Sequence, residues 1–150
     1  MRPVATPLLV TGALVAAAQF IRLDRTAPPA GSDIAAPLPV ESVLRRACYD
    51  CHSSQTEWPW YSQIAPLSWL IDREVREGRR RLNFSDWGDY ASDPGTAALK
   101  LEQIATRVTA GDMAPWYYCW LHPEARLTPD ERELLVHWAR SGSTAPSSAG

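Results

Sequence analysis

Residues 48–52 read CYDCH, and this short stretch restricts the chain more than any other part of the sequence. Two cysteines three positions apart, followed directly by a histidine, suit a metal ion, a redox-active dithiol, a disulfide or a covalently attached haem. A zinc site normally needs four ligands, and the third cysteine, Cys119, has no partner at a suitable spacing. A dithiol of the thioredoxin type lies in an alternating strand and helix pattern, which this sequence lacks.

The C-x-x-C-H spacing is typical of c-type haem. The thiols of Cys48 and Cys51 add to the two vinyl groups of the haem, and His52 is then placed under the iron as an axial ligand. We therefore predict one covalent haem c as the cofactor of this chain.

The start of the chain predicts export. Residues 4–21, VATPLLVTGALVAAAQFI, form an uncharged run of 18 between Arg2 and Arg22. Such a run is just long enough to span a hydrocarbon core of about 30 Å, although the three alanines at 16–18 also offer a signal-cleavage site. We favour an anchor over a cleaved signal for residues 1–22. In both cases we expect the remainder on the periplasmic side of the bacterial cytoplasmic membrane, where c-type haem is attached.

Composition divides the rest of the chain. Residues 23–37 are rich in Pro and Ala and predict a linker, and residues 143–150 predict a flexible tail. The haem-binding domain is therefore expected at residues 38–142, a size at which a covalent cofactor contributes much of the core. A net charge of -2 with 45% apolar residues favours neither disorder nor a nucleic-acid partner.

Four helical patterns without a strand pattern predict an all-α fold, a bundle of about four helices. Apolar residues recur at helical spacing in segments 40–47, 67–75, 97–108 and 128–138. The first segment leads directly into Cys48, and the second is expected to end near Gly78. The last opens with a capping box from Thr128 to Glu131. The predicted buried face of the second helix is Leu67, Leu70, Ile71 and Val75.

Met113 is the predicted second axial ligand. It lies in AGDMAPWYY, between the third and fourth predicted helices, and the other methionine is the initiator. Pro115 restricts Ala114 to extended geometry, which helps to hold such a loop against a flat ring. A methionine that fills a gap in the core is the plainer interpretation. His122 is the alternative ligand and would give bis-histidine ligation, whereas His137 is expected at the surface.

Aromatic residues follow both proposed axial ligands, and we expect them to pack around the haem and keep it dry. After the attachment motif these are Trp58, Trp60, Tyr61 and Trp69, and after Met113 they are Trp116, Tyr117, Tyr118 and Trp120. Trp60 and Tyr61 are the candidates for direct haem contact.

Basic and polar residues near the second helix are candidates for the haem carboxylates. Arg79, Arg80 and Arg81 can pair with carboxylates in bidentate fashion, although a charge run after a helix is usually a solvated face. Asn83 and Trp87 are weaker candidates for the same carboxylates. Cys119 is expected to be a small buried group, with an intermolecular disulfide as the alternative.

Two long segments of the chain are similar to a known family. The segments CYDCHSSQTEWPWYSQIAPLSWLIDREVREGRRRLNFSDW and GDMAPWYYCWLHPEARLTPDERELLVHWA resemble a small bacterial haem-binding domain family related to c-type cytochromes. The motifs CxxCH, WPWY, NFSDW and GDMAPWYY carry this resemblance, which covers nearly the whole predicted domain. It implies a cytochrome c-like helical fold, haem attachment at Cys48 and Cys51, and axial ligation by His52 and Met113.

The predicted function is that of a monohaem c-type cytochrome, which passes single electrons between redox proteins and is not an enzyme. Methionine ligation and a dry site both favour the ferrous state. The alternative is a haem sensor or a small peroxidase in which Met113 leaves the iron, and His122 is then the nearby acid–base group. A haem module that assists a larger complex is a third interpretation.

Overall fold

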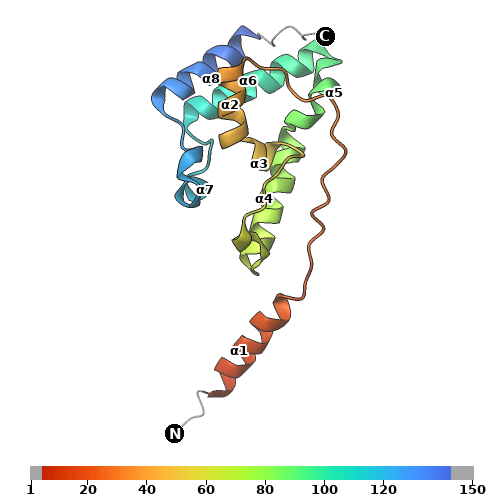
Figure 1. Cartoon of the computed structure of the whole chain (residues 1–150), viewed down its shortest axis with the longest axis vertical. Helices are drawn as coiled ribbons and strands as arrows, with labels where there is room; N and C mark the ends of the chain where they lie inside the picture. Colours follow the sequence, from red (N-terminus) through yellow and green to blue (C-terminus); the bar gives the residue numbers. More distant parts are fainter. Residues whose placement is uncertain (1–4, 143–150) are drawn as a thin grey trace.

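The computed structural model describes residues 5–142, and all regular structure in this range is helical (Figure 1). The predicted all-α class is therefore confirmed. The α-helices are α1 (Ala5–Ala18), α2 (Leu38–Ala47), α3 (Tyr49–His52), α4 (Leu67–Arg81), α5 (Trp87–Ala91), α6 (Pro94–Ala110), α7 (Trp116–Leu121) and α8 (Pro129–Ser141). The short 3-10 helices are η1 (Trp60–Gln63), η2 (Phe84–Asp86) and η3 (Pro123–Ala125). The tail predicted at 143–150 lies outside the described residues.

The four predicted helices correspond to α2, α4, α6 and α8. The carboxylate of Asp93 accepts hydrogen bonds from the first turn of α6, and Gly111, whose φ is +76°, caps the other end of that helix. The predicted capping box opens α8, with the Thr128 side chain accepting from Glu131 N–H. Helices α6 and α8 pack against each other, and α2 packs against α8. The centre of this core is formed by Leu44, Ala105 and Leu135, which are fully buried.

Helix α4 extends further than the sequence predicts, through Gly78 to Arg81. The glycine is needed because α3 crosses α4 at this point. A Cβ atom on Gly78 would lie 2.3 Å from the carbonyl oxygen of Cys51, a distance that real side chains do not adopt. Gly78 therefore permits a close backbone approach in the helix interior and does not end the helix.

The predicted buried face of α4 has a different environment from the one expected. Leu67 and Leu70 are 36% and 50% exposed, and Val75 is buried. The helical period was correctly identified, but Leu70, Ile71 and Val75 line a cavity instead of packing only against other helices. The sequence pattern could not reveal this difference, because a cavity and a protein core both select apolar side chains.

The predicted linker lies along the folded part of the chain (Figure 1). The N–H groups of Gly31 and Ile34 donate to the carbonyl oxygens of Ser85 and Phe84, at 2.9 and 3.0 Å. Ile34 is only 5% exposed and belongs to the hydrophobic core. Contacts with the folded unit therefore begin upstream of residue 38.

Helix α1 lies apart from the other helices and carries the apolar run of the N-terminus (Figure 1). Its 14 residues correspond to about 21 Å at 1.5 Å per residue. Within residues 5–142, no helix combines the length and the apolar character that crossing a bilayer requires. The membrane anchor remains a prediction.

The close contact of α3 with α4 predicts that Gly78→Ala is destabilising. The added methyl group must push the backbone of Cys51 away, which costs about 1–3 kcal/mol as overpacking. Gly95→Ala is the matched control, because a Cβ atom there meets its nearest neighbour at 3.6 Å. Denaturant unfolding of the haem-loaded proteins measures both changes. Equal stability of Gly78→Ala and wild type would contradict the close crossing.

Candidate functional site

A cavity of about 850 Å³ lies among α3, α4, α6 and the segment that leads into α7. Cofactor and small-molecule sites usually measure about 300–1,000 Å³ and are mainly apolar. Leu70 and Val75 of α4 and Ile104 and Val108 of α6 line this cavity. An extended flat cofactor therefore has both the space and the apolar walls that it needs.

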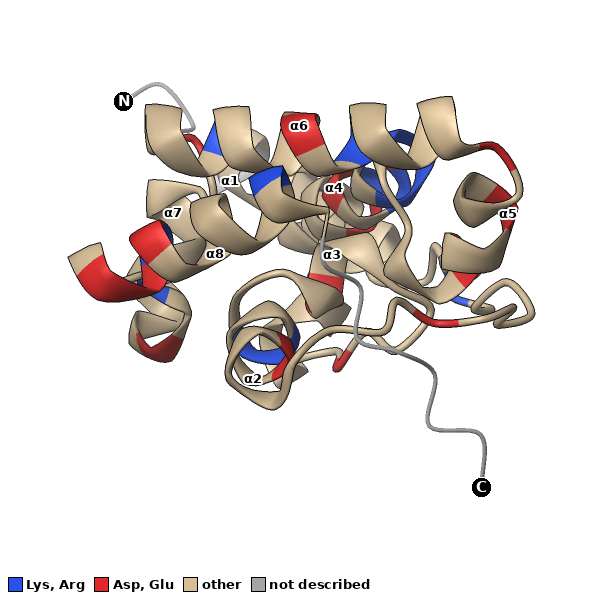
Figure 2. Cartoon of the chain, turned by 90° about the horizontal axis from the view of Figure 1, so that it is seen from above, with Lys and Arg blue, Asp and Glu red and all other residues tan. Residues whose placement is uncertain are grey.

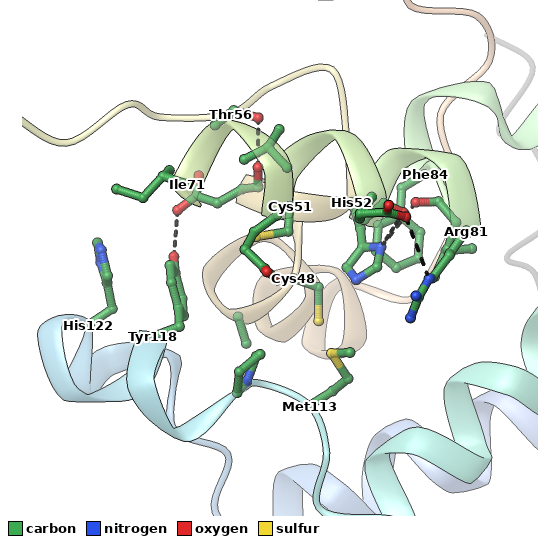
Figure 3. Close-up of a pocket in the computed structure, with 18 of the residues that line it drawn as sticks. Cys48, Cys51, His52, Thr56, Ile71, Arg81, Phe84, Met113, Tyr118 and His122 are labelled. Carbon is green, nitrogen blue, oxygen red and sulfur yellow. Dashed lines mark hydrogen bonds and ion pairs between the residues drawn. The ribbon is translucent and has the colours of Figure 1, made fainter. Parts of the chain in front are cut away.

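The CYDCH motif lies at one wall of the cavity. Helix α2 ends at Ala47, with Cys48 as its C-cap, and α3 begins at Tyr49. Cys48, Cys51 and His52 all line the cavity (Figure 3). Neither cysteine of the motif is in a disulfide. Burial raises the pKa of the Cys48 thiol to about 12 and that of Cys51 to about 11, so both thiols are neutral near pH 7. Within residues 5–142, no group of three His, Cys, Asp or Glu side chains forms a metal site.

His52 is held through one ring nitrogen, which leaves the other available. Its Nδ1 atom lies 3.0 Å from the carbonyl oxygens of both Gly78 and Leu82. Carbonyl oxygens only accept, so Nδ1 carries the proton and Nε2 keeps its lone pair. Burial also lowers the pKa of His52 and keeps the ring neutral. A neutral imidazole oriented through Nδ1–H is the usual form of a histidine that ligates a metal.

Met113 lies in the segment between α6 and α7, as predicted. Its side chain lines the cavity, and Figure 3 shows the sulfur atom pointing toward Cys48 and the ring of His52. Met113 does not belong to the hydrophobic core of the described residues. Its position therefore favours a ligand role over the filling of a gap in the core. The thiol that does pack in the core is Cys119, which is 6% exposed.

His122 also lines the cavity, but both of its ring nitrogens contact protein groups. Nε2 pairs with the hydroxyl of Tyr61, and Nδ1 lies 3.0 Å from a carboxylate oxygen of Glu124. The ring stacks on Tyr118, with 4.3 Å between ring centroids. A bis-histidine centre would require the bond to Tyr61 or the bond to Glu124 to break. The sulfur of Met113 is therefore more available to a bound cofactor than the ring nitrogens of His122.

Tyr118 connects this end of the cavity to the attachment motif. Its hydroxyl donates to the carboxylate of Asp50 at 2.6 Å, and burial raises the pKa of Tyr118 well above its ordinary value. Asp50 stands inside the CYDCH motif and lines the cavity together with Tyr118. The sequence patterns did not indicate this pair, because their side chains come from positions 68 residues apart.

The predicted carboxylate-binding residues separate into two groups. Arg81 lines the cavity, and the amine of Lys100 on α6 donates to its carbonyl oxygen at 2.6 Å. Figure 2 shows the basic residues at the end of α4 beside those of α6. Arg79 lies outside the cavity lining and donates to Ser53 O and Thr56 Oγ1, both at 2.8 Å. Lys100 was not indicated by the sequence, since a lone lysine on a helix carries no signal of its own.

The side chain of Asn83, like that of Arg79, bonds to neighbouring residues of the protein. It is 3% exposed, its side-chain oxygen accepts from Ser85 N–H, and its amide donates to Asp86. Asn83 therefore caps η2 and lies outside the cavity lining. Trp87 is likewise buried outside that lining.

The aromatic residues also separate into two groups. Trp58, Tyr61, Tyr117 and Tyr118 line the cavity, as expected for its walls. Trp60, Trp116 and Trp120 are instead 77%, 81% and 77% exposed. Trp60 is therefore not placed for the haem contact that the sequence suggested. In α7, Trp116 and Trp120 are four residues apart and share one face, while Cys119 occupies the buried face.

Comparison with known proteins supports the interpretation of the cavity. A family model described as a haem-binding domain matches residues 13–141, which include every residue that lines the cavity. That description concerns binding of haem and names no catalysed reaction. No curated protein and no solved structure gives a significant match.

Asn83→Ala should reduce stability without changing the haem. Loss of a side-chain cap costs about 0.5–2 kcal/mol. The optical spectrum and haem content should stay as in the wild type, because the Asn83 amide bonds to Asp86 and Ser85 and lies outside the cavity lining. Denaturant unfolding and absorbance spectra of the same samples measure the two effects. A changed reduction potential with unchanged stability would instead assign Asn83 to the haem carboxylates.

Proposed function

Because the chain belongs to the haem-binding domain family, we propose that this haem protein is a monohaem c-type cytochrome, a carrier of single electrons with histidine and methionine axial ligands. The observation that carries the proposal is the shared cavity. Two free thiols, an imidazole with an available Nε2 and a methionine sulfur line the same space. These are the four groups that a c-type centre with His/Met ligation requires.

Each group has a defined task in this proposal. Cys48 and Cys51 would hold the haem through two thioether bonds, and His52 and Met113 would be the ligands of its iron. The bound haem supplies reversible one-electron chemistry at its iron. The carbonyl oxygens of Gly78 and Leu82 keep the His52 ring oriented, and the apolar side chains of α4 and α6 exclude water.

The surroundings of His122 favour a carrier over a peroxidase. A peroxidase needs an acid–base group that is free to exchange a proton with its substrate. His122 is engaged by Tyr61 on one side and by Glu124 on the other, and it stacks on Tyr118. A sensor or peroxidase in which Met113 leaves the iron is the second candidate, and the ligation experiment below separates the two.

The proposed location is the periplasmic side of the bacterial cytoplasmic membrane. Thioether attachment takes place outside the cytoplasm, and the apolar residues of α1 support attachment to the membrane through the N-terminus. The proposed partners are other redox proteins, which give and accept single electrons.

Covalent attachment predicts that haem stays with the polypeptide through denaturation and acid–organic extraction. The double variant Cys48→Ala, Cys51→Ala should lose all haem under these conditions. Cys119→Ala is the matched control and should retain it, because Cys119 lies in the core and not at the cavity. Haem staining after denaturing electrophoresis measures the outcome. Extraction of haem from the wild type would rule out the c-type assignment and leave a non-covalent haem protein.

Ligation by Met113 predicts a low-spin wild type that reacts slowly with carbon monoxide. Met113→Ala should open the sixth position, lower the reduction potential and admit carbon monoxide. His122→Ala serves as the control and should leave the iron low-spin. Absorbance spectra in both oxidation states and stopped-flow mixing with carbon monoxide measure these changes.

Two other outcomes have defined meanings. A wild type that is already high-spin and binds carbon monoxide rapidly supports the sensor or peroxidase. A low-spin Met113→Ala protein combined with a changed His122→Ala spectrum assigns the ligand to His122.

A further inference from the structure

One end of the molecule exposes an unusual number of large apolar side chains. We call this surface the aromatic end. It consists of Trp60, Ile64, Leu67 and Trp69, which run from η1 to the start of α4, and of Trp116, Trp120 and Leu121 from α7. Each of these side chains is at least 36% exposed. Large apolar patches on a soluble protein usually mark an interaction surface.

The two halves of the aromatic end are joined by hydrogen bonds. Tyr61 OH pairs with Nε2 of His122. Trp60 precedes Tyr61 and Leu121 precedes His122, so this contact brings the two halves close together. Tyr117 OH donates to Glu74 of α4 at 3.1 Å. These bonds direct the tyrosine hydroxyls inward, and the tryptophans beside them face solvent. The aromatic end is therefore one surface at the edge of the cavity.

The N-terminal helix is attached to this same end. The side-chain amide of Gln19 donates to the carbonyl oxygen of Ala65 at 3.2 Å and accepts from its N–H at 3.0 Å. Ala65 lies between η1 and α4, at the centre of the first half of the aromatic end. In Figure 1, α1 leaves the molecule from this side, while α5, α6 and α8 lie on the far side.

Helix α1 indicates what covers the aromatic end. It contains no charged residue, and Leu8, Leu9 and Leu14 are 71%, 73% and 66% exposed. A helix that is apolar on all sides has no face suited to water and requires an apolar environment around it. Because Gln19, directly after α1, bonds to Ala65, an apolar medium around α1 would meet the domain at the aromatic end. A lipid bilayer surrounds a helix on all sides, whereas a single protein partner usually covers one face.

The chemistry of the aromatic end also suits a bilayer. Tryptophan and tyrosine are enriched at the boundary between lipid and water, where their rings sit at headgroup level. Arg25 lies in the chain that connects α1 to the domain, bonds to Ser62 of η1, and stacks over the ring of Trp58 at 4.4 Å. A basic side chain at this junction suits anionic headgroups.

We propose that the aromatic end docks on the surface of the membrane into which α1 inserts, so that the domain contacts the bilayer directly and is not connected to it by the linker alone. This inference rests on the periplasmic membrane location proposed above. It adds a lipid-binding surface on the haem domain itself, with Trp60, Trp116 and Trp120 in the headgroup region.

The test is hydroxyl-radical footprinting of the full-length haem-loaded protein in nanodiscs of phosphatidylethanolamine and phosphatidylglycerol, at one protein per disc. Protection is expressed relative to the intrinsic reactivity of each residue. Trp60, Trp116 and Trp120 should be protected several-fold more than Leu38 and Leu99, which are 80% and 57% exposed and lie outside the aromatic end. Equal protection of the two sets would mean that the domain stands clear of the bilayer, and would overturn the proposal.

A pair of double variants separates lipid docking from other causes of protection. Trp60→Glu with Trp120→Glu should remove the protection of Trp116, because anionic headgroups repel the new carboxylates. Leu38→Glu with Leu99→Glu is the matched control and should leave the protection of Trp116 unchanged.

Protection that appears only with two or more copies per disc would assign the surface to self-association, and a protein that elutes free of nanodiscs would contradict lipid binding altogether. The absorbance spectrum of each sample reports haem ligation independently, so failure of docking is distinguishable from failure of the cytochrome assignment.

Discussion

The crossing of α3 over the end of α4 is the contact on which the site depends. Gly78 allows the two backbones to approach, and its carbonyl oxygen then accepts from Nδ1 of His52. The carbonyl oxygen of Leu82, just beyond the helix, accepts from the same nitrogen. The Gly78 carbonyl oxygen also accepts from the N–H of Leu82 at 2.9 Å, so His52 adds a second donor to an oxygen that already caps the helix. The same few atoms end α4, orient the imidazole and hold the cysteine motif at the cavity wall.

The sequence predicted the elements of this arrangement better than their contacts. Caps and apolar periods located α2, α4, α6 and α8, because those signals are local and depend on a few neighbouring residues. Gly78 was taken for a helix end because glycine commonly has that role, and its true role requires knowledge of Cys51, 27 positions earlier. Arg79 and Asn83 were assigned to the haem on residue type alone. Their hydrogen bonds to Ser53, Thr56, Ser85 and Asp86 depend on side-chain direction, which residue type does not specify.

The segment that precedes the domain illustrates a second limit of composition. Proline- and alanine-rich residues suggested a free tether, since they show no apolar period. Backbone hydrogen bonds from Gly31 and Ile34 nevertheless attach this segment to η2, and the side chain of Ile34 fills part of the core. An extended segment can be held by backbone hydrogen bonds and a single buried apolar side chain, and neither feature produces a periodic pattern in the sequence. This segment bonds to Phe84, whose ring lies 6.3 Å from that of His52 between centroids, so it helps to position the site.

The two histidines of the cavity differ in how their ring nitrogens are hydrogen-bonded, a difference that sequence position does not reveal. Both His52 and His122 line the same space, and both carry the ring nitrogens that iron accepts. In His52 one nitrogen donates to carbonyl oxygens and the other is left with its lone pair. In His122 a tyrosine hydroxyl and a carboxylate engage both nitrogens, so coordination would first require a bond inside the protein to break. Met113 has no such competing bond among its described contacts, and a thioether accepts hydrogen bonds only weakly. The energetic cost of freeing His122 therefore supports the proposed Met113 ligation over a bis-histidine centre.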